Sequence, residues 1–169
     1  MGNKLDNGGS LGGCMSWGIL GKDLYLLDVL RRRMECPELK RAVRDQHERF
    51  RPSVVLIEDK ASGTRLIQEL VAGGLYATCH QPQSDKVMRL HAQTAMIENG
   101  FVRLPNAAPW LAQYLHEMTT FPNGRYDDQV DSTAQMPDWF KRGSGPRSNA
   151  GISELYRHRS QHLCLQERT

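Results

Sequence analysis

The sequence lacks the signatures of several protein classes. No run of about 18 apolar residues is present, so no membrane-spanning helix is predicted. The N-terminus has no basic stretch followed by an apolar one, which excludes a secretory signal peptide. No G-x-x-x-x-G-K-[ST] motif occurs, so these 169 residues contain no P-loop for a nucleoside triphosphate. The four cysteines are scattered without a C-x-x-C pair, which predicts reduced thiols rather than disulfides or a zinc site.

Net charge is small and unevenly distributed. The chain carries +3 overall, but residues 141–169 alone hold six Lys/Arg and two Glu, which leaves the body slightly negative. Residues 1–140 therefore do not form a generally basic surface for binding DNA. Gly, Ser, Pro, Arg and Asn dominate from Lys141 onward, so we predict a basic flexible tail over 141–169. It could touch nucleic acid or another acidic partner, or be a solvated end with a weak helix near 152–164.

The chain is organised around the segment VVLIEDKASG (54–63). The run from Val54 to Ile57 is short, apolar and rich in β-branched residues, which predicts a buried strand. Glu58 and Asp59 follow directly, then a turn and a helix that opens at Thr64. Open α/β sheets place their chemistry where a buried strand ends before a helix. The alternative is that both acids simply begin a loop.

Hydrophobic periodicity predicts an α/β domain over residues 1–140. Residues 1–13 read as a glycine-rich loop. An Arg triplet (31–33) follows the second predicted strand, and on a continuing strand Arg31 and Arg33 share one face. They could contact phosphates or form a solvated strand end. The predicted strands are 14–20, 24–30, 54–57, 75–80 and 101–104, and the predicted helices are 37–50, 64–71, 84–97, 109–118 and 127–139.

A second group of acids lies in RYDDQVD (125–131). Asp127 or Asp128 would begin a helix, and Asp131, one turn along, can share their face. The structural alternative is that Asp127 caps the helix, although three acids in five residues exceed what a cap needs. Clustered carboxylates suit Mg²⁺, which prefers oxygen ligands. Two such ions about 3.5–4 Å apart can activate a water and stabilise the leaving oxygen of a phosphodiester.

With both acidic stretches in view, the chain resembles the C-terminal nuclease domain of the large terminase subunit of tailed bacteriophages, over most of residues 3–140. The segments that carry the resemblance, in their order and spacing, are VLIEDKASG (55–63), Asp85-Lys86 with Arg89, GFVRLP (100–105), FPNGRYDDQVD (121–131) and Pro37-Glu38-Leu39 after the Arg-rich strand.

The resemblance implies a ribonuclease-H-like mixed α/β sheet flanked by helices. It implies a hydrolase, an endonuclease with two Mg²⁺ or Mn²⁺ ions, that cuts concatemeric double-stranded DNA while a phage or prophage genome is packaged. Glu58, Asp127 and Asp128 would be catalytic metal ligands, and Asp131 a supporting ligand. The implied partners are double-stranded DNA, an upstream ATPase domain, the small terminase subunit and the portal protein, in the bacterial host cytoplasm and without a membrane.

One departure from the family pattern is serious. The family's first metal-binding Asp lies on a first strand that precedes an Ala-Asn-Lys-like sequence, and Gly2-Asn3-Lys4 resembles the end of that sequence. The chain would therefore lack the central first strand, and β-strands on either side would keep unpaired edges. Asp6 is a poor substitute. The alternative functions are a non-catalytic packaging module that binds DNA or portal without cutting, and a resolvase or other nuclease of similar fold.

Overall fold

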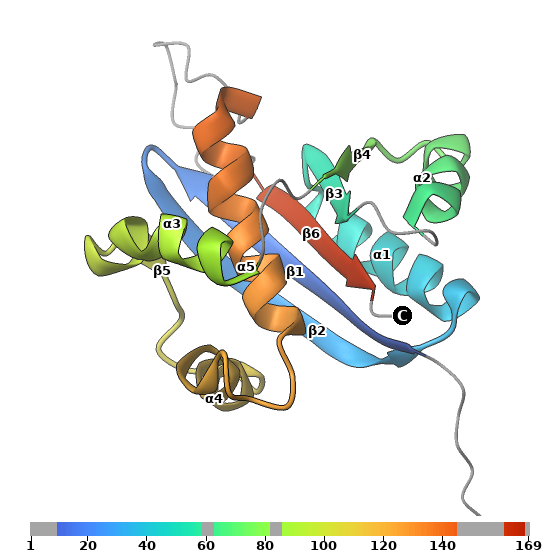
Figure 1. Cartoon of the computed structure of the whole chain (residues 1–169). Coiled ribbons are helices and arrows are strands. Elements are labelled where there is room, and N and C mark those ends of the chain that lie inside the picture. The colour runs from blue at the N-terminus through green and yellow to red at the C-terminus, as the bar shows by residue number, and fades with distance from the viewer. Residues whose placement is uncertain (1–9, 59–62, 82–85, 145–160, 168–169) are drawn as a thin grey trace, which may run out of the picture.

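The computed structural model describes residues 10–58, 63–81, 86–144 and 161–167, which form a mixed sheet covered by helices on both faces (Figure 1). The strand order is β4-β3-β6-β1-β2-β5. Its strands are β1 (Ser10–Leu20), β2 (Asp23–Met34), β3 (Val54–Glu58), β4 (Ala77–His80), β5 (Val102–Arg103) and β6 (Gln161–Glu167). The helices are α1 (Cys36–Phe50), α2 (Gly63–Ala72), α3 (Lys86–Glu98), α4 (Leu111–Thr120), α5 (Asp128–Trp139) and the π-helix η1 (Phe140–Ser144).

The hairpin of β1 and β2 begins earlier than the sequence predicts. Ser10 pairs with Met34, and the two-residue turn starts at Gly21, whose φ of +62° suits glycine. The expectation of a loop over 1–13 is wrong for the residues from Ser10 onward. Gly12 and Gly13 favour a loop locally, but here they pair with strands on both sides, which compensates for their entropic cost.

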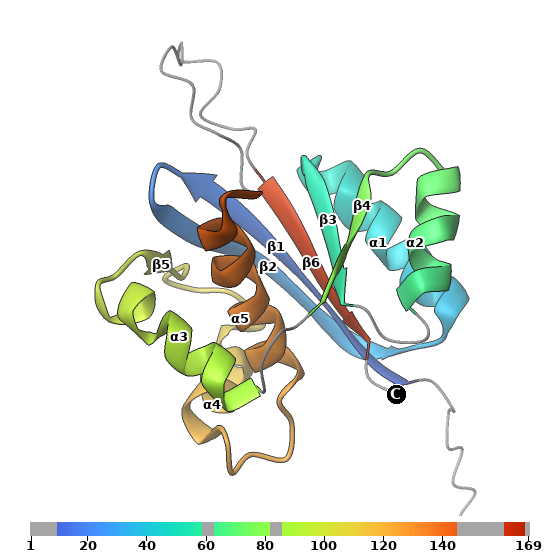
Figure 2. The same cartoon turned by 45° about the horizontal axis from the view of Figure 1, so that its top comes forward.

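The central position of the sheet is filled from the C-terminal end of the chain. β6 lies antiparallel to β1, with Cys14 opposite Leu165, and parallel to β3, with Ile57 opposite Leu165 (Figure 2). The expected gap with two unpaired edges is therefore closed. The expectation of a flexible tail is wrong for 161–167, because two hydrogen-bonding edges are available to this segment. Residues 145–160 lie outside the described part.

Two apolar clusters lie on opposite faces of the sheet. On one face α1 and α2 cover β1 and β3; on the other, α5 and α4 cover the same two strands and β2 (Figure 1). The first cluster includes Cys14, Val55 and Ile57. The second includes Met15, Trp17, Val54, Leu56 and Met136. All five residues of β3 are buried, as expected for a strand covered on both faces.

Cys164 lies in the middle of β6, opposite Met15 of β1 and Leu56 of β3. We expect Cys164→Pro to lower the free energy of unfolding by on the order of 3 kcal/mol, because proline removes a backbone donor from a central strand. Thermal unfolding followed by circular dichroism measures this. Cys164→Ala, which keeps the N–H, is the control, and equal melting temperatures for the two variants would contradict the placement of β6.

Candidate functional site

Strand β3 presents Glu58 to the α5 side of the sheet. Side chains alternate between the faces of a strand, and Val54 and Leu56 belong to the cluster beneath α5. Glu58 continues this set and is 7% exposed. The predicted acid at the end of a buried strand is therefore present, and it faces the layer that carries the second acidic stretch.

Four residues lie level with Glu58 in a row across the sheet. Glu58 pairs with His80 of β4 on one side. On the other side Ile57 pairs with Leu165, so Gln166 is the next register position on β6. Gln166 pairs with Gly13 of β1, and Gly13 pairs with Arg31 of β2. The row runs Arg31, Gly13, Gln166, Glu58, His80.

His80 ends the row beside Glu58. Its side chain is 6% exposed, and its Nε2 lies 3.8 Å from a carboxylate oxygen of Asp138 on α5. Burial lowers the pKa of His80 below its ordinary value, more than the nearby Asp138 carboxylate raises it. The imidazole is therefore biased towards its neutral form. Asp138 also pairs with Arg142 at 2.8 Å, which supplies the carboxylate with a permanent cation.

The three acids of the second stretch have different surroundings. Asp127 occupies the N-cap position of α5, but its side chain makes no capping hydrogen bond. Asp128 is 4% exposed, with its Oδ2 3.7 Å from Nη2 of Arg31. Asp131 is 1% exposed and accepts a 2.7 Å hydrogen bond from Nη2 of buried Arg89 on α3. Asp131 thus holds α3 against α5, a structural role in place of the predicted role of supporting metal ligand.

Glu117 of α4 caps α5 in place of Asp127. Its two carboxylate oxygens accept hydrogen bonds from the backbone N–H of Gln129 at 2.6 Å and from its side-chain amide at 2.7 Å. A carboxylate at a helix N-terminus satisfies backbone donors and is favoured by the helix dipole. Glu117 could not be identified from the sequence, because a cap supplied by a different helix leaves no local pattern. Glu117 fixes the point at which Asp127 and Asp128 enter the helix.

Arg31 links this cap to the acids. Its Nη2 lies 3.4 Å from Glu117 and 3.7 Å from Asp128, and its side chain is 8% exposed. Of the two sequence alternatives for the Arg triplet, a solvated strand end is wrong for Arg31 and correct for Arg32 and Arg33, which are exposed. Arg31 is buried because β2 passes beneath α4 and the start of α5.

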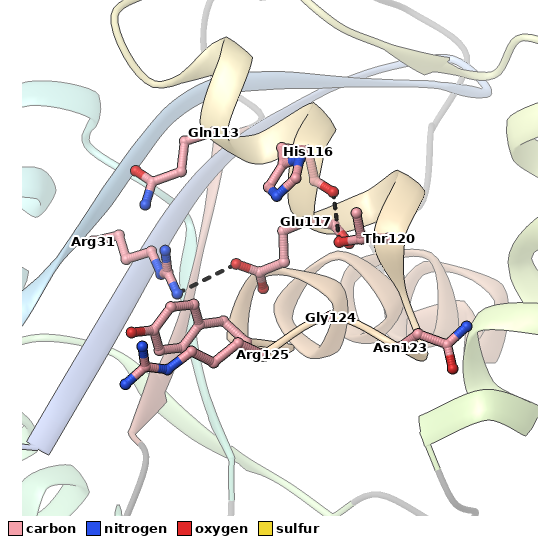
Figure 3. A pocket seen from close by; sticks show the side chains of 9 residues that line it. Arg31, Gln113, His116, Glu117, Thr120, Asn123, Gly124 and Arg125 are labelled. Carbon is pink, nitrogen blue, oxygen red and sulfur yellow. Dashed lines mark hydrogen bonds and ion pairs between the residues drawn. The ribbon is translucent and has the colours of Figure 1, made fainter.

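A pocket of about 430 Å³ opens beside this network (Figure 3). Arg31 comes from β2, Gln113 and Glu117 from α4, and Arg125 from the connection between α4 and α5. Figure 3 shows Arg31 and Glu117 pointing towards one another. The pocket therefore adjoins Asp128 through Arg31.

A hydroxyl pair joins α4 to α5. The hydroxyl groups of Tyr114 and Thr133 lie 3.1 Å apart, and burial raises the pKa of Tyr114 to about 12. The Tyr114 ring also packs edge-on against Trp110. These contacts and the Glu117 cap hold α4 and α5 as one unit over β1 and β2.

The described residues do not form a ready metal centre. Among them, no group of three or more His, Cys, Asp or Glu is placed to hold a metal ion. Glu58 and Asp128 are suitable oxygen donors, but Asp128 lies beside Arg31 of β2, and β6 and β1 lie between β2 and the strand that carries Glu58. Asp128 and Asp131 also have arginine partners that balance their charge. Asp59, next to Glu58, lies outside the described residues.

Comparison with known protein families shows which family has this domain. Residues 6–136 match the family model described as the terminase RNaseH-like domain. The chain belongs to this family. Comparison with curated proteins and with solved structures gave no match. The predicted ribonuclease-H-like mixed sheet and the resemblance to the terminase nuclease domain are thus confirmed.

The match to the terminase RNaseH-like domain covers every predicted site residue. It runs from before β1 to Met136 of α5, so Glu58, Asp127, Asp128 and Asp131 lie inside it. β6 lies beyond it. The central strand of this sheet therefore comes from outside the part that matches the terminase family. In the described part of this terminase domain no helix is long and apolar enough to cross a membrane.

We expect Glu117→Ala to lower the free energy of unfolding by about 3 kcal/mol, because it uncaps α5 and removes an ion partner of buried Arg31. Glu117→Gln retains an oxygen acceptor for Gln129 and should cost less. Urea unfolding followed by tryptophan fluorescence measures both. Equal losses for the two variants would mean that charge alone, and not the capping hydrogen bond, carries the effect.

We expect Asp131→Asn to lower the free energy of unfolding by about 3 kcal/mol, because it leaves Arg89 buried without its anion. Replacing both residues, Asp131→Leu with Arg89→Leu, should recover most of that loss. Asp45→Asn, at an exposed position of α1, is the matched control and should change stability by less than about 0.5 kcal/mol. Additive losses in the double variant would show that the two side chains are not coupled.

Proposed function

We propose that this domain is the metal-dependent endonuclease of a phage or prophage large terminase, cutting concatemeric double-stranded DNA during genome packaging. Membership of the terminase RNaseH-like family supports it. The observation that carries it is that Glu58, at the end of β3 on the α5 side of the sheet, and Asp128, at the start of α5, are both buried carboxylates.

Mg²⁺ or Mn²⁺ is the cofactor in this proposal. Glu58, Asp127 and Asp128 offer the hard oxygen donors these ions prefer. The described donors do not converge on one point, so we assign no coordination geometry. The register position between Glu58 and Gly13 belongs to Gln166, an uncharged residue. Gln166→Asp would bring a negative charge to that register position.

The assembly partners belong to the same proposal. Double-stranded DNA is the substrate, and an upstream ATPase domain, the small terminase subunit and the portal protein are the packaging partners, in the bacterial host cytoplasm. Family resemblance supports these partners.

A second candidate is a packaging module that binds DNA or portal protein without cutting. Two contacts favour it: Arg31 lies against Asp128, and Arg89 lies against Asp131. In both, a guanidinium neutralises an acid that a metal ion would otherwise need as a ligand. Binding of a metal would have to compete with these internal cations.

Plasmid cleavage in Mg²⁺ or Mn²⁺ tests the two candidates. We expect Glu58→Ala to lower cleavage by at least about 100-fold, since even residues that only support a metal ligand cost about 10- to 100-fold. Gln166→Asp should raise cleavage above that of the natural chain, and Gln166→Asn, which adds no charge, is its control.

The outcomes separate the candidates. Cleavage that Glu58→Ala abolishes supports the endonuclease. If only Gln166→Asp cuts, the natural sequence is the non-catalytic module and its deficiency lies at that strand position. If no variant cuts while the domain still binds DNA, the endonuclease proposal is wrong for this chain.

A further inference from the structure

The pocket beside Arg31 is unexplained by the acids of the candidate site. It lies between β2, α4 and the connection from α4 to α5 (Figure 3). Besides Glu117, the polar side chains on its wall include two arginines, Arg31 and Arg125, and the hydrogen-bonding groups of Gln113, His116 and Asn123. Glu117 is already engaged by Gln129 and Arg31. The remaining lining is rich in donors, which favours an anionic ligand.

Arg31, which lines the pocket, retains unused hydrogen-bonding capacity. Its Nε and Nη2 are buried and make no hydrogen bond to any residue that the structure describes. Its carboxylate contacts, at 3.4 and 3.7 Å, are longer than hydrogen bonds. The Arg31 side chain lines the pocket and is 8% exposed, so a small shift of its guanidinium would bring these donors to a ligand oxygen. This buried cation is the second observation, independent of the cavity, that points to an anion.

Arg125 supplies a second cation at the rim. It is exposed, and its guanidinium lies 5.3 Å from the centre of the Tyr126 ring, with Arg31 4.7 Å from the same ring. Arg125 forms no ion pair with a carboxylate in the part of the chain that the structure covers. Stacking on Tyr126 restricts where its guanidinium can lie, so less entropy is lost when it binds an anion. Its charge is available to a ligand.

We propose that this pocket binds a backbone phosphate of a DNA strand, on the side of the candidate site that faces Asp128. The proposal rests on the proposed function in one respect, because it takes DNA as the ligand. Phosphate oxygens match the guanidinium donors of Arg31 and Arg125, and Gln113 can donate from its amide. The pocket would position a strand relative to Asp128 and would carry no base specificity.

The test is DNA binding without cleavage, measured by fluorescence anisotropy of a labelled duplex in EDTA with the Glu58→Ala background. Arg125→Ala should weaken binding about fivefold and lower the slope of log affinity against log salt by about 0.9, the loss of one phosphate contact. Gln113→Ala should weaken binding less and leave the slope unchanged, because it removes a neutral donor.

Arg41→Ala is the matched control. Arg41 is an exposed residue of α1, on the opposite face of the sheet, and its loss should change neither affinity nor slope. Inorganic phosphate at constant ionic strength is the competitor that identifies the source of the ligand. Competition at low concentration, with no effect of Arg125→Ala on DNA binding, would assign the pocket to free phosphate.

The remaining outcomes are equally decisive. Equal losses of DNA affinity for Arg125→Ala and Arg41→Ala would mean that only general surface charge matters, and this would overturn the proposal. Unchanged affinity and slope for Arg125→Ala, or no DNA binding by the parent chain, would also overturn it. Because the assay contains no metal and uses Glu58→Ala, a chain that binds through Arg125 but never cuts would fail the endonuclease proposal and satisfy this one.

Discussion

The structure depends on filling the position between β1 and β3. Both strands are buried, so their backbone donors and acceptors need partners within the sheet, and each unmet buried group costs about 1–3 kcal/mol. β6 meets this need on both sides at once. Only with that position filled do the helices find continuous surfaces on which to pack. Glu58 and Arg31 lie at the same level of the sheet because β6 pairs with β3 on one side and with β1 on the other, which fixes the register between these strands.

The second determinant is the alternation of charge at the start of α5. Glu117, Arg31 and Asp128 follow one another as anion, cation and anion, all largely buried. In such a set each charge is costly alone and acceptable with its neighbours. The helix that carries the candidate acids is thereby tied to α4 and to β2. This arrangement gives α5 a fixed beginning, and it also gives Asp128 a cation that competes with a metal.

Most of the fold could be predicted from local signals. The buried run before Glu58, the proline that opens α1 and the helical spacing in α5 all act within a few residues, and the corresponding elements are present. The position of Glu58 at a strand end followed from the same pattern. Arg31 with Glu117 could not be foreseen, because the pair joins distant segments and depends on how α4 docks.

β6 was missed for a related reason. Its sequence alternates apolar and polar residues around Leu163 and Leu165, which is a usable strand signal, but it lies among residues whose composition favours a flexible tail. The placement of β6 depends on tertiary structure: the sheet has an open position between β1 and β3, and its two edges can pair with a strand of suitable length. Local sequence propensity contains no information about such an open position in the sheet. The role of Asp131 also could not be read from local sequence, because it depends on the partner Arg89 of α3.

The pairing of β1 with β6 sets the order in which the domain can be assembled. These strands come from opposite ends of the described chain, and closing a loop of that size costs more conformational entropy than forming the β1–β2 hairpin. During synthesis the hairpin, β3 and the helices leave the ribosome before β6. The nascent sheet therefore waits with two edges open until the last strand arrives. Topologies dominated by such distant contacts fold slowly, and open edges invite pairing with other chains in that interval.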